Sequence, residues 1–323
     1  MIYDVVALGE LLIDFTPAGF SAEGYPVYQM NPGGAPANVA VAVSKLGGKS
    51  AFIGKVGEDY FGYFLKKVLE KNGVETKGLK FTDLSPTTLT FVHLDEKGER
   101  SFTFVRNPGA DALLESDDVD LSLIENAKIF HFGSLSLSYP TCKKATTKAV
   151  EFATKLSKLI SYDPNHRPMI WKDPKVAKQV MVEALKYAHI VKLSQEELYL
   201  LTSEEDLEKA LKTVMKMGTK LVFITMGSKG CYFAFSKGQG HVPAFNVKVV
   251  DTTGAGDAFL GAVLYKLSRV ELLPWELSYK DMEQIVRFAN AVAGLCVTKR
   301  GAIPALPTLE EVERFLGGGQ SCF

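Results

Sequence analysis

The sequence predicts an α/β fold in which helices cover both faces of a mostly parallel central sheet. Two observations carry this prediction. From residue 129 onwards, short apolar runs alternate with longer helical stretches, which is the rhythm of strand–helix–strand units. The chain has 323 residues, 46% of them hydrophobic, enough for one large domain. We therefore expect residues 1–323 to form a single three-layer α/β/α domain.

The first third of the chain contains strands, helices and an irregular stretch. Residues 16–30 are rich in Gly, Pro, Ser and Tyr, have no helical period, and are expected to form a loop or short strands away from the core. The regular elements expected here are strands over Tyr3–Leu8, Leu11–Phe15 and Ser50–Val56, and helices over Val39–Val43 and Tyr60–Asn72.

A β-hairpin interrupts this pattern. Thr87–Asp95 and Arg100–Val105 alternate apolar and polar residues, and the polar turn Glu96–Glu99 joins them. An antiparallel hairpin inside a strand–helix chain is best explained as a small accessory sheet. Together with residues 16–31, residues 87–105 are expected to form a lid.

The rest of the chain is regular. Strands are expected over Ile129–Phe132, Leu159–Tyr162, Ile190–Leu193, Leu221–Thr225, Gly230–Phe235 and His241–Phe245. Helices are expected over Tyr139–Leu156, Val176–Leu185, from Ser194, Leu207–Met217, Ala258–Leu267, Asp281–Thr298 and Leu309–Phe315.

Composition narrows the function. Lys plus Arg and Asp plus Glu number 37 each, which argues against nucleic acid or an anionic membrane as the main partner. The four cysteines form no C-x-x-C pair and the five histidines fall on separate elements, so neither a disulfide framework nor a histidine metal site is expected. The absence of a signal peptide or apolar span predicts a cytoplasmic protein.

The most informative stretch is residues 247–262. Val247–Val250 alternates like a strand end, Thr252 and Thr253 can cap a helix, and Gly254-Ala255-Gly256 leave bare backbone N–H groups at its start. Such a turn is an anion site, because unpaired N–H groups and the positive end of the helix dipole coincide.

Asp257 stands beside this anion site, where a carboxylate is unexpected. The helix dipole alone favours Asp in a first turn, so a structural role is one reading. The other is a base that takes a proton from a nucleophile while charge develops nearby. Neither a Rossmann turn nor a Walker loop fits, because Phe259 and Val43 replace required glycines.

A second unusual stretch is Asn31–Asn38. Its glycines, Gly33 and Gly34, indicate either an ordinary turn or a place where ligand hydroxyls approach bare backbone. Asn38 could direct its amide at the same ligand. The polar clusters Asp14, Asp163–Arg167, Gly227 and Asp251–Asp257 all follow predicted strand ends, where open α/β sheets bind ligands.

At these residues the chain resembles the ribokinase-like (PfkB) sugar kinases, and within them the fructokinases, over nearly its whole length. Asp251–Asp257 matches the family's C-terminal signature, and Asn31–Ala40 with Leu46–Gly48 and Gly54–Asp59 matches the N-terminal one. Further blocks that look like fructokinase versions are Phe104–Asp111, Asp163–Arg167 and Lys299–Pro304.

The resemblance implies roles around the transferred phosphoryl group and the sugar. Asp257 would be the base, and Gly254, Ala255 and Gly256 would supply N–H groups to the phosphoryl. The residues that would bind or lie near the sugar are Asp14, Gly33, Gly34, Asn38, Arg106 and Arg167. For each arginine, a structural or surface ion pair is an equal alternative.

The resemblance also implies ATP and cations. ATP would lie along Lys192, Ser194, Thr225, Gly227, Gly230 and Asn290. Mg²⁺ would bridge the phosphates and be held mostly through water, with Glu197 arranging that water. A monovalent cation, K⁺, would be held by Asp251 and Thr253 with carbonyls of Cys296, Lys299 and Gly301. The chain departs from the family at Ser194, where an asparagine is usual.

The leading hypothesis is ATP-dependent phosphorylation of fructose at its 6-position. The alternative enzyme is a 2-keto-3-deoxygluconate kinase, and the Phe104–Asp111 block favours fructokinase. A non-catalytic sugar-binding regulator is disfavoured, because Asp257, Gly254 and Gly256 are all present. Lids of relatives often pair across a dimer, so the resemblance also implies a homodimer formed through the lid.

Overall fold

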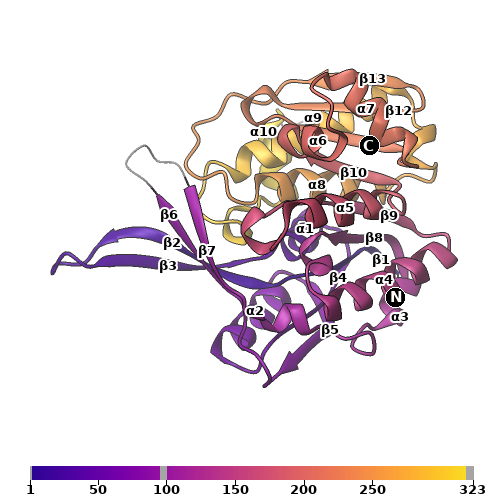
Figure 1. Cartoon of the computed structure of the whole chain (residues 1–323). Coiled ribbons are helices and arrows are strands. Elements are labelled where there is room, and N and C mark those ends of the chain that lie inside the picture. The colour runs from indigo at the N-terminus through magenta and orange to yellow at the C-terminus, as the bar shows by residue number, and fades with distance from the viewer. Residues whose placement is uncertain (1, 95–99, 318–323) are drawn as a thin grey trace.

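The computed structural model describes residues 2–94 and 100–317, and it contains the expected three-layer α/β/α architecture (Figure 1). A nine-stranded sheet has the order β13-β12-β11-β10-β9-β8-β1-β4-β5. β12 runs antiparallel to β11 and β13, and the other neighbouring strands are parallel. Its strands are β1 (Tyr3–Leu8), β4 (Ser50–Gly57), β5 (Val74–Thr82), β8 (Ala127–Gly133), β9 (Leu159–Asp163), β10 (Ile190–Ser194), β11 (Leu221–Thr225), β12 (Cys231–Phe235) and β13 (Gly238–Val242).

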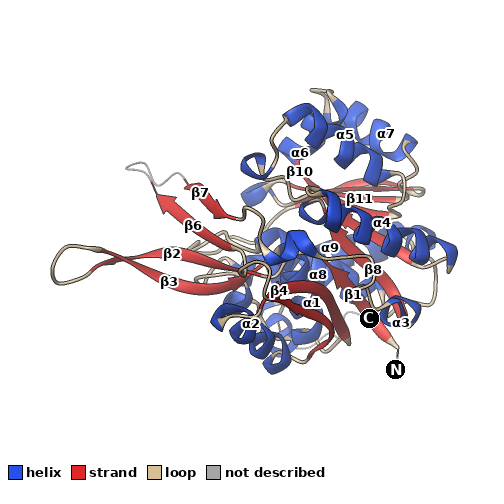
Figure 2. Ribbon diagram, turned by 60° about the horizontal axis from the view of Figure 1, so that its bottom comes forward, coloured by secondary structure: helices blue, strands red, loops and turns tan. Residues whose placement is uncertain are grey.

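Helices cover both faces of this sheet, because its strands are apolar on both sides. One core joins the sheet to α1 (Ala35–Lys45), α2 (Tyr60–Lys71), α8 (Ala255–Leu267), α9 (Tyr279–Cys296) and α10 (Leu309–Phe315). The other joins it to α3 (Leu121–Glu125), α4 (Pro140–Lys155), α5 (Pro174–Leu185), α6 (Gln195–Thr202) and α7 (Leu207–Lys216). Figure 2 shows the two layers of helices on either side of the sheet.

A second, smaller sheet extends from one side of the domain. Its order is β3-β2-β6-β7, formed by β2 (Leu12–Phe20), β3 (Pro26–Gly33), β6 (Leu89–Leu94) and β7 (Arg100–Val105). Figures 1 and 2 show β2 and β3 projecting as a long arm. The accessory sheet is thus confirmed. Of the two alternatives expected for residues 16–30, the structure has strands: β2 and β3 pair with each other, and residues 21–25 connect them. The predicted turn Glu96–Glu99 lies outside the described residues.

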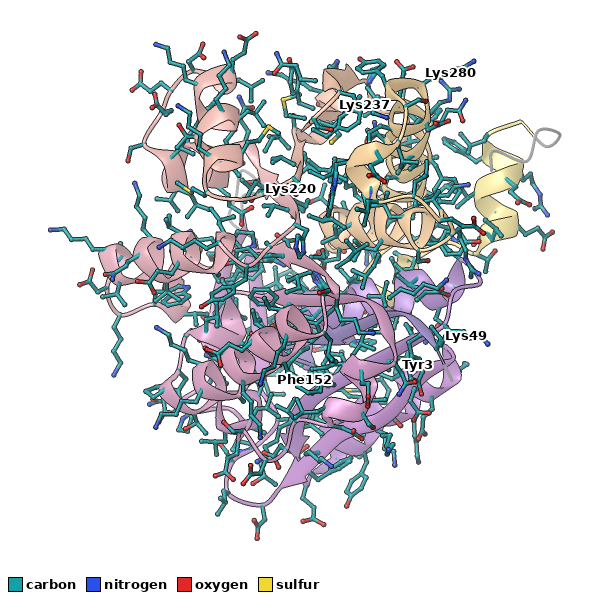
Figure 3. The ribbon with its side chains drawn as sticks, turned by 90° about the vertical axis from the view of Figure 1, so that its right-hand side faces the viewer. Tyr3, Lys49, Phe152, Lys220, Lys237 and Lys280 are labelled. Atoms are coloured by element: carbon teal, nitrogen blue, oxygen red, sulfur yellow. The ribbon has the colours of Figure 1, made fainter. Side chains whose placement is uncertain are left out.

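The small sheet stands at the edge where the parallel strands end. Figure 3 views the opposite edge, where Tyr3 opens β1 and where Lys49 and Lys220 directly precede β4 and β11. Ligands of open α/β sheets bind beyond the carboxyl ends of the strands. The small sheet therefore lies over the edge where a site is expected.

Two predicted elements differ from the structure, and one strand of the large sheet was not predicted. Residues 243–254 contain no strand, so the expected strand end at Val247–Val250 is wrong; the amides of Val250 and Asp251 instead donate to the Val297 carbonyl. The last strand of the sheet is Gly238–Val242 and not His241–Phe245. A glycine usually indicates a turn, but Gly240 lies inside β13. A Cβ there would lie 2.2 Å from the Tyr279 hydroxyl, so the packing of Tyr279 explains a glycine within the strand. The edge strand β5 was not predicted.

Two further features concern the environment of the chain. In the part of the chain that the structure describes, no helix is both long enough and apolar enough to cross a membrane. Cys142, Cys231 and Cys296 are buried free thiols, and Cys322 lies outside the described residues.

The contact between α1 and α8 depends on Gly261, and this gives a stability prediction. A Cβ at Gly261 would lie 2.5 Å from the Cβ of Ala42, so Gly261→Ala should lower the free energy of unfolding by about 1–3 kcal/mol. In α9, a Cβ at Gly294 would meet only ordinary contacts, the nearest at 3.8 Å. Gly294→Ala should therefore be neutral or stabilise by up to about 1 kcal/mol. Urea unfolding of both variants measures the difference, and equal effects would contradict the close helix packing.

Candidate functional site

A cavity of about 270 Å³ lies where the N-terminal and C-terminal halves meet under the small sheet. The predicted residues in its wall are Asp14, Gly34, Asn38, Arg167, Lys192 and Thr252–Asp257. The small sheet adds Thr90, Val92, Phe102 and Phe104, which form a partly aromatic cover. Residues far apart in the sequence are thus brought into one site, as the polar clusters at strand ends predicted.

Asp257 is buried in the first turn of α8 and is held from both halves of the chain. The Asn38 side chain donates from Nδ2 to Asp257 Oδ2 at 2.7 Å, and Asn165 Nδ2 donates to Oδ1 at 3.4 Å. Burial raises the pKa of Asp257 to about 6; nearby Asp163 adds to this shift, while Lys192, Asn38 and Arg167 oppose it. Hydrogen bonds to both oxygens fix the orientation of the carboxylate, which is therefore positioned to accept a proton.

The turn before Asp257 has the geometry of an anion site. Gly254 is the N-cap of α8 with φ 77°, and a Cβ there would lie 2.7 Å from Ala302 Cβ, so both conformation and space require glycine. The predicted threonine caps are wrong: α8 has no side-chain cap, and the Thr253 hydroxyl donates to Asp251 Oδ1 at 2.7 Å. The first turn of α8 therefore borders the cavity with main-chain groups.

Lys192 supplies a positive charge next to this turn. Its Nζ lies 2.9 Å from Asp163 Oδ2, and both side chains are buried. Burial alone would lower the pKa of Lys192, but Asp163, Glu197 and Asp257 outweigh it and raise the pKa above its usual range. A Cβ at Gly256 would lie 2.9 Å from Lys192 Nζ, so the glycine leaves room for the ammonium group beside the helix N-terminus.

The opposite end of the cavity suits a polyhydroxylated ligand. Asp14 is in β2 and lines the cavity, and burial raises its pKa to about 6 against the opposing charge of Arg167. A Cβ at Gly33 would lie 2.3 Å from Asp14 Oδ2, and one at Gly34 would lie 2.3 Å from the Glu10 carbonyl oxygen. At both positions only a glycine leaves room for the neighbouring group, which is the Asp14 carboxylate at Gly33 and the Glu10 main chain at Gly34.

The structure separates the two predicted arginines. Arg167 lines the cavity. Arg106 is not in its wall: its Nε and Nη2 each lie 2.8 Å from Asp111 Oδ2, and Nη1 donates to Ser138 Oγ at 3.0 Å. Arg106 is therefore in the buried structural ion pair that the sequence left open as an alternative.

Ser194 and Glu197 form a capping box at the start of α6. The Glu197 amide donates to Ser194 Oγ at 3.1 Å, and the Ser194 amide donates to Glu197 Oε2 at 2.8 Å. Glu197 Oε1 accepts from the His166 amide at 2.7 Å. Serine in place of asparagine thus preserves the helix cap, and both Glu197 oxygens already accept main-chain hydrogen bonds.

The other predicted nucleotide residues lie at or beyond the ends of β10–β13. Thr225 pairs with Ser194 across β11 and β10. Gly227 and Gly230 have φ 56° and 96° in the turn after β11, and a Cβ at Gly230 would lie 2.2 Å from the Val242 carbonyl oxygen. Asn290 Nδ2 donates to the carbonyls of Val242 and Pro243, at 3.0 and 3.1 Å. Gly227 and Gly230 therefore permit the turn after β11, and Asn290 holds the main chain at the end of β13.

The predicted monovalent-cation residues surround Asp251. Its Oδ1 accepts from the Thr253 amide and its Oδ2 from the Gly301 amide, each at 2.9 Å. The Cys296 carbonyl accepts from the Lys299 amide at 3.2 Å, and the Lys299 ammonium pairs with Glu311 at 2.8 Å. Within residues 2–94 and 100–317, no three His, Cys, Asp or Glu side chains are grouped as a metal site would need.

Three residues of the site were not assigned a role from the sequence. Asp163 holds Lys192, Asn165 holds Asp257, and Glu10 lines the cavity between β1 and β2. Asp163 and Asn165 belong to the block at the end of β9, whose position was the available signal. Glu10 had no signal, since an acidic residue between two apolar strands is not itself unusual.

Comparisons with known proteins agree with this geometry. Residues 3–309 match the family described as pfkB family carbohydrate kinase. The chain is 44% identical to a probable fructokinase-3 of Arabidopsis thaliana, over 97% of this chain and 91% of that protein. It is similar to the fructokinase of Xylella fastidiosa with bound ATP, with TM-score 0.91, 33% identity and 98% of each chain covered. A fructokinase double mutant of Vibrio cholerae O395, bound to fructose, ADP and potassium ion, gives TM-score 0.87, 35% identity and 97% of each chain covered.

The buried Asp257 carboxylate should cost stability, and the cost should depend on pH. Its pKa is raised from 3.8 to about 6, so the folded state binds the proton more tightly than the unfolded state. Stability should therefore fall as pH rises from about 4 to about 6 and stay lower above that range. Asp257→Asn should raise the free energy of unfolding by about 1–2 kcal/mol at pH 7.5 and by much less at pH 4.5.

Urea unfolding at the two pH values measures this. Asp83→Asn, at an exposed position, is the matched control and should change stability at neither pH. A gain at pH 4.5 as large as that at pH 7.5 would contradict the raised pKa.

Proposed function

The chain belongs to the pfkB family of carbohydrate kinases, and we propose that it transfers the γ-phosphoryl group of ATP to fructose, giving fructose 6-phosphate. The observation that carries the proposal is the position of Asp257. Its carboxylate lies at a helix N-terminus suited to phosphate and is held by Asn38 from the other half of the chain. A proton acceptor and an anion site thus face one cavity.

The reaction follows from these positions. A sugar held by Asp14, Gly34 and Asn38, which line the cavity, and by Gly33 beside Asp14 would place one hydroxyl against Asp257, which takes its proton as the oxygen attacks phosphorus. The main chain of Gly254–Gly256 and the Lys192 ammonium would stabilise the charge on the transferring phosphoryl. The reaction therefore depends on position and charge, with no covalent enzyme intermediate.

The nucleotide and its metal would enter from the side of β10 and β11. ATP with Mg²⁺ supplies the phosphoryl group and neutralises part of its charge. The metal would be carried by the phosphates and reached from Glu197 through water. Asp163 keeps Lys192 charged for the incoming phosphates.

The substrate assignment can be tested directly. With purified protein, ATP and Mg²⁺, fructose should give a higher kcat/KM than 2-keto-3-deoxygluconate, ribose or adenosine. The similarity to fructokinases supports this order. Arg167 lines the cavity and is the cation that the carboxylate of the keto acid would use, so the comparison of fructose with the keto acid is the decisive one. A coupled assay for ADP measures all four substrates. Faster turnover of the keto acid would reject fructose, and no turnover of any would favour a sugar-binding regulator.

The base assignment gives a second kinetic prediction. Asp257→Ala should lower kcat by roughly 10²–10⁴-fold and leave binding of fructose and ATP largely intact. In the wild type, kcat/KM for fructose should fall as pH drops below about 6, because the base is then protonated. Steady-state rates and calorimetric binding check both statements. A variant with near wild-type kcat, or a rate that does not change between pH 7 and 5, would show that Asp257 is not the base.

We also propose that the small sheet closes over the sugar and pairs with its counterpart in a homodimer. Six of its residues line the cavity: Leu12, Asp14, Thr90, Val92, Phe102 and Phe104. The projecting arm exposes Phe20 (77%) and Tyr25 (71%) (Figure 1). Large exposed aromatic side chains on an arm are typical of interaction surfaces.

Light scattering after size exclusion tests the dimer. The wild type should elute as a dimer, and Phe20→Ser with Tyr25→Ser should give a monomer with lower fructose affinity. Leu272→Ser removes a side chain that is 57% exposed outside the arm and should leave the dimer intact. A wild-type monomer at working concentration would exclude the proposed dimer.

Two finer assignments complete the proposal. K⁺ would be held near Asp251, Thr253 and Gly301, which the structure brings together beside the anion site. The potassium-bound fructokinase of Vibrio cholerae supports this assignment.

A cytoplasmic location fits the three buried thiols, which remain unpaired in a reducing compartment.

A further inference from the structure

Glu10 is a buried acidic residue in the wall of the cavity that none of the roles above uses. It lies in the connection between β1 and β2, and its side chain is 4% exposed. It lines the same cavity as Asp14, Gly34 and Asn38. Glu10 is therefore placed at the sugar end of the site.

The two oxygens of this carboxyl group differ in their surroundings. Oε1 accepts the Ala35 amide at 3.0 Å, which ties Glu10 to the first residue of α1. Oε2 is shielded from solvent and has no hydrogen-bond partner among the described residues. Burial raises the pKa of Glu10 to about 7, against the hydrogen bond from the Ala35 amide. The side chain thus has one anchored and one unused oxygen.

Arg106, whose positive charge acts on Glu10, does not supply a partner for Oε2. Arg106 lowers the pKa of Glu10 through its charge, but its guanidinium is occupied by Asp111, Ser138 and the Leu135 carbonyl. Asp111 acts in the opposite direction and raises the pKa. Glu10 therefore lies beside a saturated ion pair and gains no direct partner from it.

An unpartnered buried polar oxygen carries a desolvation penalty that a ligand can relieve. A sugar hydroxyl suits Glu10 in either protonation state, since it can donate to a carboxylate and accept from a carboxylic acid. Glu10 lines the cavity in which the sugar is proposed to bind, so a sugar hydroxyl is the available partner.

We propose that Glu10 is a sugar-binding residue: its Oε1 fixes the Gly34–Ala35 main chain, and its Oε2 pairs with one hydroxyl of the bound sugar other than the one phosphorylated. The proposal rests on the proposed function, since it names a further contact of the same sugar. It assigns the unused oxygen a ligand and makes Glu10 a determinant of sugar specificity.

The test combines variants with substrates that lack single hydroxyls. Kinetic constants are measured for wild type, Glu10→Ala and Glu10→Gln with fructose and with its 1-, 3- and 4-deoxy analogues. Glu10→Ala should raise the KM for fructose roughly ten-fold while the KM for ATP changes less than about two-fold. Glu10→Gln keeps an oxygen for the Ala35 amide and should lose less. Glu151→Ala, at an exposed position on α4, is the control and should change neither constant.

The analogues separate contact from mere support of the fold. For the deoxy sugar that lacks the hydroxyl facing Glu10, wild type and Glu10→Ala should have nearly equal kcat/KM, while the other sugars keep the ten-fold difference. An equal loss for every sugar, or none for any, would overturn the proposal. Should Glu10→Ala fail to fold, Glu10→Gln decides alone, by the same comparison among sugars. Wild-type turnover of fructose tests the proposed function separately, so the two failures are distinguishable.

Discussion

The hydrogen bond from Asn38 to Asp257, at 2.7 Å, is the interaction on which the site depends. It joins α1 to α8 across 219 positions of sequence, and the same two helices pack so closely that Gly261 is required at their contact. The hydrogen bond from Asn38 and the close packing of α1 on α8 together fix the position of the Asp257 carboxylate. Because α1 begins directly after Gly34, the residues proposed to bind the sugar and the residue that orients Asp257 belong to one packed element.

The cavity contains both buried acidic side chains and positively charged side chains. Asp257, Asp14 and Glu10 are buried acids whose pKa values are raised. Lys192 and Arg167 oppose the shift of Asp257, Arg167 opposes that of Asp14, and Arg106 opposes that of Glu10. Burying carboxylates costs stability, which fits the general observation that strain of this kind is stored at functional sites. A sugar offers hydroxyls to the acids, and phosphates offer negative charge to the cations. The cavity thus suits both halves of the proposed reaction.

The sequence predicted the parts of this site that local rules control. Gly254 and Gly256 indicated an anion turn, and alternation indicated the small sheet, because those signals arise within a few residues. The prediction failed where long-range packing decides. The amides of Val250 and Asp251 donate to the Val297 carbonyl, and Val247–Val250 joins no sheet. Gly240 lies in a strand against which Tyr279 packs, and neither partner is near in sequence.

The pKa of Asp257 tests the central claim most directly. Carbon NMR of protein labelled in its Asp carboxyl groups, with Asp257→Asn to assign the signal, should show a pKa near 6 in the free protein. Loss of the hydrogen bond in Asn38→Ala should move that pKa higher, since the Asn38 amide stabilises the charged form. An ordinary pKa near 4, unchanged in Asn38→Ala, would contradict the account of a buried base held by Asn38.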